Sequence, residues 1–340
     1  MPAPLSAGKQ KGLESIADSR GIIRALAIDQ RSALRSLFGR AMGVEPASVP
    51  SESLTQFKVA VSSLLTPHAS AILLDPEYGL PAAARRAPGT GLLLACEETG
   101  YDKRVAGRLP RLLPQWSAER LVDAGANAVK LLLYYSNRSS AEINDFKRTF
   151  VEKVGAECAS LDVPFFLELV SYAEGMDEKQ SEFARIKPEV VSAGLKEFSR
   201  PQYQVDVLKV GMPVNLSMVE GSPSPAPEIL YTRNQARQYF LDAAACTSIP
   251  LIYLSEGVSN DTFHFGLELA AEAGVRFSGV LCGRATWKDG VEVYAKHGVH
   301  ALEQWLAREG VHNIENVNRC LQAATPWFAA GGVASPSRDR

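Results

Sequence analysis

Short apolar runs recur along the chain and alternate with longer segments that mix polar and apolar residues. There are eight such runs, at 21–28, 70–74, 91–96, 127–135, 164–170, 206–210, 250–255 and 279–284. Their length and β-rich composition are typical of strands, and the segments between them have helical character. Alternation of strand and helix predicts a parallel sheet, and eight units without a break in composition favour a closed (β/α)₈ barrel over an open sheet.

Helix boundaries can be read in two of the intervening segments. Ser117 is placed to cap a helix that Gly125 would end, and Asn260 and Gly274 are expected to do the same for a later one. On this basis we expect one barrel domain at 21–328, preceded by a helical extension at 1–20. The polar tail at 329–340 is expected to be disordered.

Composition excludes several classes of protein. The net charge of −2 gives no electrostatic case for binding nucleic acid or an anionic membrane surface. No apolar run approaches the ~20 residues that span a bilayer, and the N-terminus lacks the apolar core of a signal peptide. The five cysteines are scattered and form no C-x-x-C motif, which indicates reduced thiols in the cytoplasm. An exposed barrel flank favours a homodimer, although no interface motif is visible.

Polar and ionisable residues stand near the carboxyl ends of the predicted strands. In chain order they are Asp29, Asp75, Glu97, Lys130, Glu168, Lys209, Ser255 and Arg284. Active sites of β/α barrels lie at that end and draw on several strands. The pattern therefore predicts a catalytic mouth.

Three of these residues lie within apolar strands, in runs such as "DVLKV". Because side chains alternate across a strand, Lys209 shares a face with Val207, and Glu168 shares one with Phe166. If these faces point inward, Lys130 and Lys209 are neighbours, with a carboxylate beside them. The alternative is that both lysines extend to the rim and simply pair with Glu168.

The inward arrangement suggests a chemistry. A second ammonium and partial desolvation both favour the neutral form of a lysine amine. A neutral amine attacks carbonyl groups and forms Schiff bases, and an adjacent carboxylate can shuttle the protons. The resulting iminium is an electron sink for breaking a carbon–carbon bond.

Other positions predict substrate contacts. In barrels, the loops after strands seven and eight often bind phosphate, and Ser255, Gly257, Gly283 and Arg284 lie there. The alternative is two ordinary turns and a surface arginine. Asp29 and Gln30 could bind substrate hydroxyls, or Asp29 could cap the following helix.

Neither a metal nor a nucleotide cofactor is expected. The five histidines show no ligand motif such as H-E-x-x-H, and no G-x-x-x-x-G-K-[ST] loop occurs.

The chain resembles the class I tagatose-1,6-bisphosphate aldolase family over about residues 20–328. The resemblance is carried by the strings "LAIDQR", "ILLDPEYGLP", "ETGYD…GRLP", "AVKLLLYY", "PFFLEL", "DVLKV…PVN", "YLS.GVS" and "GVLCGRATW". It implies cleavage of D-tagatose 1,6-bisphosphate to glycerone phosphate and D-glyceraldehyde 3-phosphate, without a metal. Gly211, Glu256 and Cys96 depart from the family pattern.

The resemblance also implies roles. Lys209 matches the Schiff-base lysine, Glu168 the acid/base glutamate and Lys130 a lysine that tunes the site. Asp29 matches the aspartate that addresses the hydroxyl at the bond to be broken, with Gln30 beside it. Ser255, Gly283 and Arg284 match residues around a substrate phosphate. Two alternatives stay open: the same mechanism on another ketose phosphate, such as fructose 1,6-bisphosphate or sulfofructose 1-phosphate, and a sugar-phosphate sensor without turnover.

Overall fold

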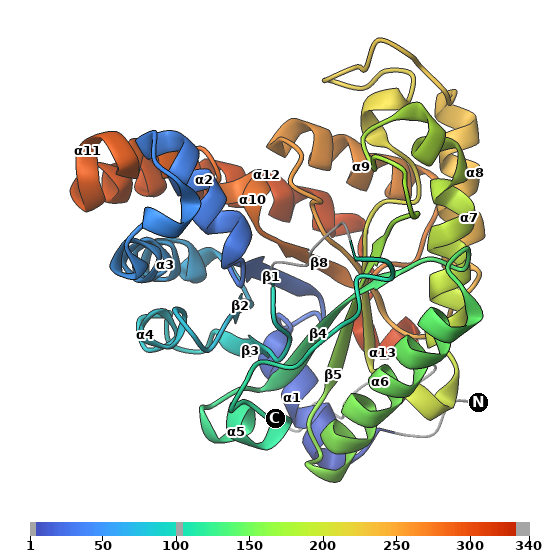
Figure 1. The fold of residues 1–340 in the computed structure, drawn as a ribbon, viewed down its shortest axis with the longest axis horizontal. Helices are drawn as coiled ribbons and strands as arrows, with labels where there is room; N and C mark the ends of the chain where they lie inside the picture. The colour runs from blue at the N-terminus through green and yellow to red at the C-terminus, as the bar shows by residue number, and fades with distance from the viewer. Residues whose placement is uncertain (1–4, 100–104, 331–340) are drawn as a thin grey trace.

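The eight apolar runs form the strands of a closed parallel barrel, as predicted. In the computed structural model, which describes residues 5–99 and 105–330, the strands pair in the order β1 to β8 and β8 closes on β1. They are β1 (Ile23–Ala27), β2 (Ala71–Leu74), β3 (Gly91–Ala95), β4 (Ala128–Tyr135), β5 (Phe165–Ser171), β6 (Val207–Val210), β7 (Leu251–Tyr253) and β8 (Gly279–Cys282). Figure 1 shows this barrel with helices around it.

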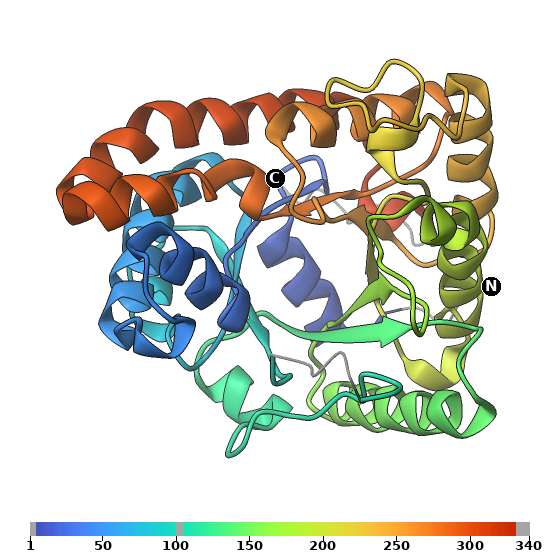
Figure 2. The same cartoon turned by 45° about the horizontal axis from the view of Figure 1, so that its top comes forward.

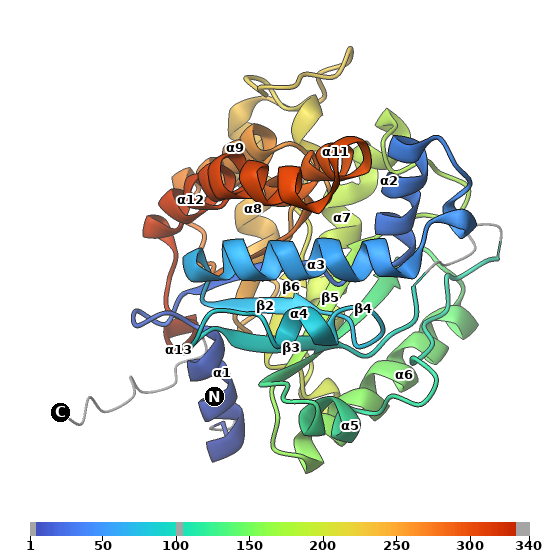
Figure 3. The same ribbon diagram turned by 90° about the vertical axis from the view of Figure 1, so that its left-hand side faces the viewer.

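Helices surround the barrel on its outer side, except that α1 and α13 lie at one end of it. Their bounds are α1 (Ala7–Ile16), α2 (Ser32–Met42), α3 (Ser51–Leu65), α4 (Leu80–Ala83), α5 (Ala118–Asp123), α6 (Ala141–Ser160), α7 (Ser181–Phe198), α8 (Arg233–Ala244), α9 (Asn260–Glu272), α10 (Arg284–Trp287), α11 (Gly290–Trp305), α12 (Val311–Cys320) and α13 (Trp327–Ala330). In Figure 2, α11 and α12 form the red band along one side, and Figure 3 shows α3 and α4 over β2 and β3.

Alternation along the strands separates two cores. The outward side chains pack against the helices, and the inward ones form a second cluster inside the barrel. Ala128, Phe166 and Val207 belong to this inner cluster, so Lys130, Glu168 and Lys209 share the inward face two residues further along each strand. The predicted faces are therefore the observed ones.

The amino-terminal end of the barrel is closed by the two ends of the chain. Leu13 of α1 and Trp327 of α13 pack in the inner cluster. Lys9 on α1 pairs with Asp206 at 2.8 Å, and Asp206 also accepts a hydrogen bond from the Phe165 N–H. Gly12 fits because a Cβ there would lie 2.5 Å from Pro164. The opposite end of the barrel is left for the cavity.

One predicted helix start is confirmed and the other is wrong by one residue. Ser117 accepts a hydrogen bond from the Arg120 N–H, and Gly125 has φ +94° after α5. At α9 the cap is Ser259, whose hydroxyl accepts from the Thr262 N–H. Asn260 instead donates its amide to backbone carbonyls elsewhere in the chain.

The predicted disordered tail lies outside the described residues from position 331 onward. Part of the "ETGYD" string, at 100–102, lies outside them as well. Across the ranges that are described, no helix combines the length and apolar character that a membrane span requires.

Candidate active site

A cavity of about 580 Å³ opens at the carboxyl end of the strands. The residues lining it come from the ends of strands and from the segments that follow them, as the barrel architecture predicts. Six of the residues to which the sequence assigned a catalytic or binding role line it: Asp29, Gln30, Glu168, Ser255, Gly257 and Arg284. Lys130, Lys209 and Gly283 lie against these residues rather than on the cavity wall itself.

Glu168 joins the two strand lysines. It is the direct register partner of Lys209 in the β5–β6 ladder. One carboxylate oxygen, Oε2, lies 2.8 Å from the Nζ of Lys209 and 2.8 Å from the Nζ of Lys130. The three groups are almost completely buried, so they do not extend to the rim.

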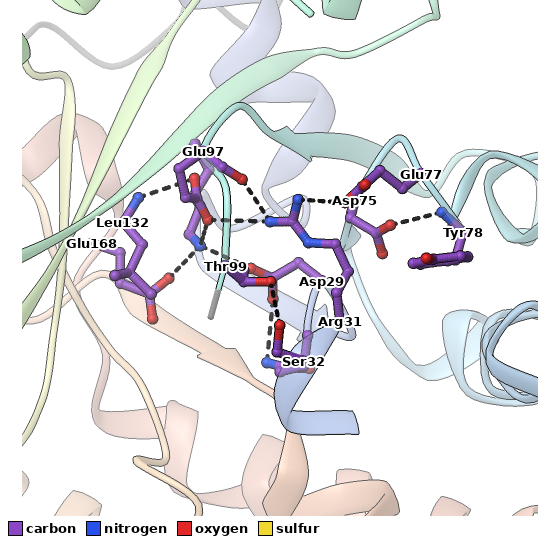
Figure 4. Close-up of polar contacts among 12 residues, drawn as sticks. Asp29, Arg31, Ser32, Asp75, Glu77, Tyr78, Glu97, Thr99, Leu132 and Glu168 are labelled. Carbon is purple, nitrogen blue, oxygen red and sulfur yellow. Dashed lines mark hydrogen bonds and ion pairs between the residues drawn. The ribbon is translucent and has the colours of Figure 1, made fainter. Parts of the chain in front are cut away.

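Lys130 is surrounded by three carboxylates. Its ammonium lies 2.8 Å from oxygens of Asp29, Glu97 and Glu168. Burial would lower the pKa of Lys130, but these carboxylates raise it well above the ordinary value. Lys130 is therefore a fixed positive charge at the base of the cavity. Figure 4 shows Glu97 and Glu168 pointing toward one another across this point.

The surrounding carboxyls respond to burial and to the two lysines. Burial alone would raise the pKa of Asp29 and of Glu168, but Lys130 and Lys209 lower both below their ordinary values. For Glu97 the order is reversed, because burial outweighs its cationic neighbours and raises its pKa. Asp29 and Glu168 are thus held as carboxylates at neutral pH.

Asp29 faces the cavity and does not cap a helix. Its carboxylate accepts from Lys130, while α2 begins after Arg31 without a side-chain cap. Gln30 donates its amide to Asp29 at 3.2 Å. The amide oxygen of Gln30 is buried and has no hydrogen-bond partner within the described ranges, so an acceptor stands free beside Asp29.

The loop after β7 and the start of α10 meet at one side of the cavity. A tight turn joins Ser255 to Val258, whose N–H donates to the Ser255 carbonyl at 3.0 Å. A Cβ on Gly257 would lie 2.7 Å from the guanidinium carbon of Arg284. Gly283 also packs closely, because a Cβ there would lie 2.7 Å from the Ala27 carbonyl oxygen. The turn and the arginine are therefore in contact.

Arg284 differs from the other arginines that line the cavity. Arg31 pairs with Glu77 at 2.9 Å, and Arg108 pairs with Glu178 at 2.6 Å. Among the residues that the structure describes, no carboxylate lies within ion-pair distance of Arg284. Arg284 lines the cavity, and its guanidinium is not neutralised by a carboxylate within those residues.

Sequence reasoning missed part of the site and included one residue too many. Glu97 was noted as a strand end but given no role, and Lys187 was not singled out, although both line the cavity. Asp75 does not line it: this carboxylate is buried against Lys58 of α3 and accepts from the Tyr78 N–H. Apolar strands ending in carboxylates were the available signal, but they do not say which carboxylate turns inward.

Within residues 5–99 and 105–330, no group of three or more histidine, cysteine, aspartate or glutamate side chains is arranged to hold a metal ion.

A closed β/α barrel with ionisable groups gathered at the carboxyl end of its strands is the architecture of barrel enzymes. The sequence model of the DeoC/LacD family of aldolases matches residues 23–289. The chain belongs to this family and is an aldolase of the carbon–carbon lyase class.

Curated relatives agree with this assignment, and a solved structure shares the fold. Tagatose 1,6-diphosphate aldolase 2 of Enterococcus faecalis is 51% identical over 327 residues, covering 96% of this chain and 97% of the relative. Tagatose 1,6-diphosphate aldolase of Staphylococcus haemolyticus is 48% identical over 323 residues, covering 94% and 98%. The fructose-bisphosphate aldolase of Plasmodium falciparum has a TM-score of 0.60 at 14% identity, covering 99% of each chain, and shares the fold.

Proposed function

We propose that the protein is a class I aldolase that cleaves D-tagatose 1,6-bisphosphate to glycerone phosphate and D-glyceraldehyde 3-phosphate. The observation that carries this proposal is the single Glu168 oxygen 2.8 Å from both Lys130 and Lys209 at the base of the cavity. The names of the curated relatives support the substrate.

Lys209 is assigned as the nucleophile because the two lysines differ in surroundings. Three carboxylates hold Lys130 as an ammonium ion, whereas the only carboxylate that contacts Lys209 in the described ranges is Glu168. Transfer of one proton to Glu168 frees the Lys209 amine. Lys130 stays charged and stabilises the negative charge of its carboxylate neighbours.

The reaction then follows from these positions. The Lys209 amine attacks the C2 carbonyl, and Glu168 delivers the proton with which the carbinolamine loses water. The iminium withdraws electrons while Asp29 accepts the proton of the C4 hydroxyl. The C3–C4 bond breaks, the aldehyde leaves, and the enamine is protonated at C3. Hydrolysis of the iminium releases glycerone phosphate and restores the amine.

Substrate binding is assigned to other residues in and around the cavity. Arg284, the turn residues Ser255 and Gly257, and Gly283 form the proposed phosphate site, since a guanidinium without a carboxylate partner in the described ranges favours a charge-assisted contact. The free amide oxygen of Gln30 accepts a hydrogen bond from a substrate hydroxyl beside Asp29.

A panel of substrates tests the specificity. We expect turnover with D-tagatose 1,6-bisphosphate to exceed that with fructose 1,6-bisphosphate and sulfofructose 1-phosphate. Faster turnover of either of the other two would show that the proposed substrate is wrong, but it would be consistent with the proposed mechanism. If the protein bound these ketose phosphates but cleaved none of them, the alternative of a sugar-phosphate sensor would be favoured.

Reductive trapping tests the mechanism. Incubation with glycerone phosphate and borohydride should attach the reduced adduct to Lys209. Lys209→Met should fold and lose both the adduct and turnover. An adduct on Lys130 would mean that Lys130 is the nucleophile and Lys209 the charged neighbour. Cleavage that needs zinc and forms no adduct would contradict the Schiff-base mechanism.

We further infer that the protein acts as a cytoplasmic homodimer. The free cysteines support a reducing compartment. Exposed apolar side chains such as Leu109 and Phe146 support an interface on one flank. Sedimentation velocity should give the mass of two chains; a single species at the mass of one chain would contradict it.

A further inference from the structure

Glu256 forms an ion pair on the cavity wall that the proposed reaction does not use. Its two carboxylate oxygens lie 2.9 and 3.1 Å from the Nζ of Lys187, which stands on α7. Both side chains line the cavity, and the side chain of Lys187 is only 9% exposed. The pair therefore links α7 to the loop after β7.

Gly211 provides the space for this carboxylate. A Cβ at position 211 would lie 2.3 Å from the Oε1 of Glu256, closer than any non-bonded contact allows. Gly211 directly follows β6, the strand that carries Lys209. Any larger residue there would displace the Glu256 carboxylate from Lys187.

The backbone of Glu256 is held in a conformation that glutamate disfavours. Glu256 has φ +49° and Gly257 has φ +81°, so the two central residues of the Ser255–Val258 turn are both left-handed. Glycine adopts this region freely, but a side chain at the first position is strained. Strained residues persist where their surroundings fix them, and such positions cluster at functional sites. In this structure the side chain of Glu256 is held by its ion pair with Lys187.

We propose that Glu256 is a positioning residue, whose ion pair with Lys187 over Gly211 fixes the Ser255–Val258 turn as part of the phosphate site. The turn contacts Arg284 through Gly257, so a shift of the turn moves the anion contacts without touching Lys209 or Glu168. This inference rests on the proposed function, because it assigns the phosphate of the ketose to this side of the cavity.

The first test is Glu256→Gln, which keeps the shape and removes the charge. We expect KM for the ketose bisphosphate and the Kd of inorganic phosphate, measured by calorimetry, each to rise about threefold or more. The value of kcat should change little, because the lysine cluster is untouched. Asp261→Asn, an exposed carboxylate at the start of α9, is the matched control and should leave both constants unchanged. Unchanged constants in Glu256→Gln would overturn the proposal.

Moving the carboxylate from position 256 to position 211 tests whether Glu256 positions the turn or only neutralises the charge of Lys187. In the double variant Gly211→Asp/Glu256→Gly, the new side chain at 211 starts where the Glu256 carboxylate lay and can still neutralise Lys187. Glycine at 256 also removes the backbone strain. We expect KM and the phosphate Kd to stay raised, because the turn is no longer tied to α7. Wild-type values in this variant would overturn the proposal, since they would mean that neutralising Lys187 is sufficient.

The phosphate measurement distinguishes failure of this inference from failure of the proposed function. If the wild-type protein turned over no ketose phosphate, the proposed function would fail, and the Kd of inorganic phosphate would still decide the role of Glu256. A wild-type protein that bound no phosphate would overturn the inference itself.

Discussion

At the scale of single residues, the site depends on how differently two lysines are surrounded. Lys130 and Lys209 both interrupt apolar strands and both contact Glu168. Of the two lysines, only Lys130 pairs with Asp29 and Glu97 in the described ranges. Together with Glu168, these carboxylates outweigh burial and raise the pKa of Lys130 well above the ordinary value. Two lysines with the same side chain therefore differ in role: Lys130 is a permanent charge, and Lys209 is the candidate nucleophile.

Arg284 provides the prediction at this scale. Arg284→Ala should raise KM for the phosphorylated ketose about ten- to a hundredfold, because a hydrogen bond to a charged group contributes roughly 1.5–3 kcal/mol. Steady-state kinetics measure this change, and thermal unfolding should show a Tm near that of the wild type. Arg40→Ala, an exposed arginine on α2, is the control. An unchanged KM would place the phosphate elsewhere in the cavity.

At the scale of elements, α6 is joined to the end of β5 by a buried lysine. The Nζ of Lys147 donates to the hydroxyl of Tyr172 at 2.9 Å and lies 4.7 Å from the centre of its ring. Arg108 packs on the same ring at 4.6 Å. Burial is the main cause that lowers the pKa of Lys147 to about 7; Glu174 opposes this shift, and Arg108 contributes to it.

The shifted Lys147 predicts a pH dependence of stability. Between about pH 7 and the ordinary lysine pKa of ~10.4, the unfolded chain binds a proton that the folded chain does not, so stability rises with pH. From pH 7 to pH 9, the free energy of unfolding should rise by about 1–2 kcal/mol more in the wild type than in Lys147→Met. Lys153→Met, an exposed position on the same helix, should follow the wild type. Denaturant unfolding at both pH values measures the difference, and parallel curves for Lys147→Met and wild type would contradict it.

At the scale of the whole molecule, closure of the barrel brings the charges together. Asp29 follows β1, Lys130 is on β4 and Glu168 on β5, yet they form one network because the strands close into a ring. Removing Glu168 leaves the buried ammonium of Lys209 without a carboxylate partner in the described ranges, which costs more than a surface pair contributes. The network therefore forms only when the barrel is closed.

This network predicts part of the stability that the protein loses as the pH falls. The pKa of Asp29 is lowered in the folded state, so its contribution to stability is present above the ordinary aspartate pKa and is lost as pH falls below it. Between pH 5 and pH 3, Asp29→Asn should lose about 1–2 kcal/mol less unfolding free energy than the wild type. Urea unfolding across this range measures the loss. Equal losses in both proteins would show that Asp29 gains no stabilisation from Lys130 on folding.

The sequence by itself determined the barrel and the inward faces of its strands. Both follow from local geometry: a period of two along each strand sends Lys130, Glu168 and Lys209 to the same side as their apolar neighbours. The start of α5 at Ser117 also depends on nearby residues alone, since the capping hydroxyl and its N–H partner are three residues apart.

Tertiary structure decided which polar groups meet. Asp75 and Glu97 both follow apolar strands, but Lys58 of α3 binds one and Lys130 binds the other. At α9, carbonyls from distant segments bind the Asn260 amide and leave the cap to Ser259. The contact of Glu256 with Lys187 above Gly211 joins three separate segments in the same way. Such pairings depend on distances across the closed barrel, and no local period along the chain encodes them.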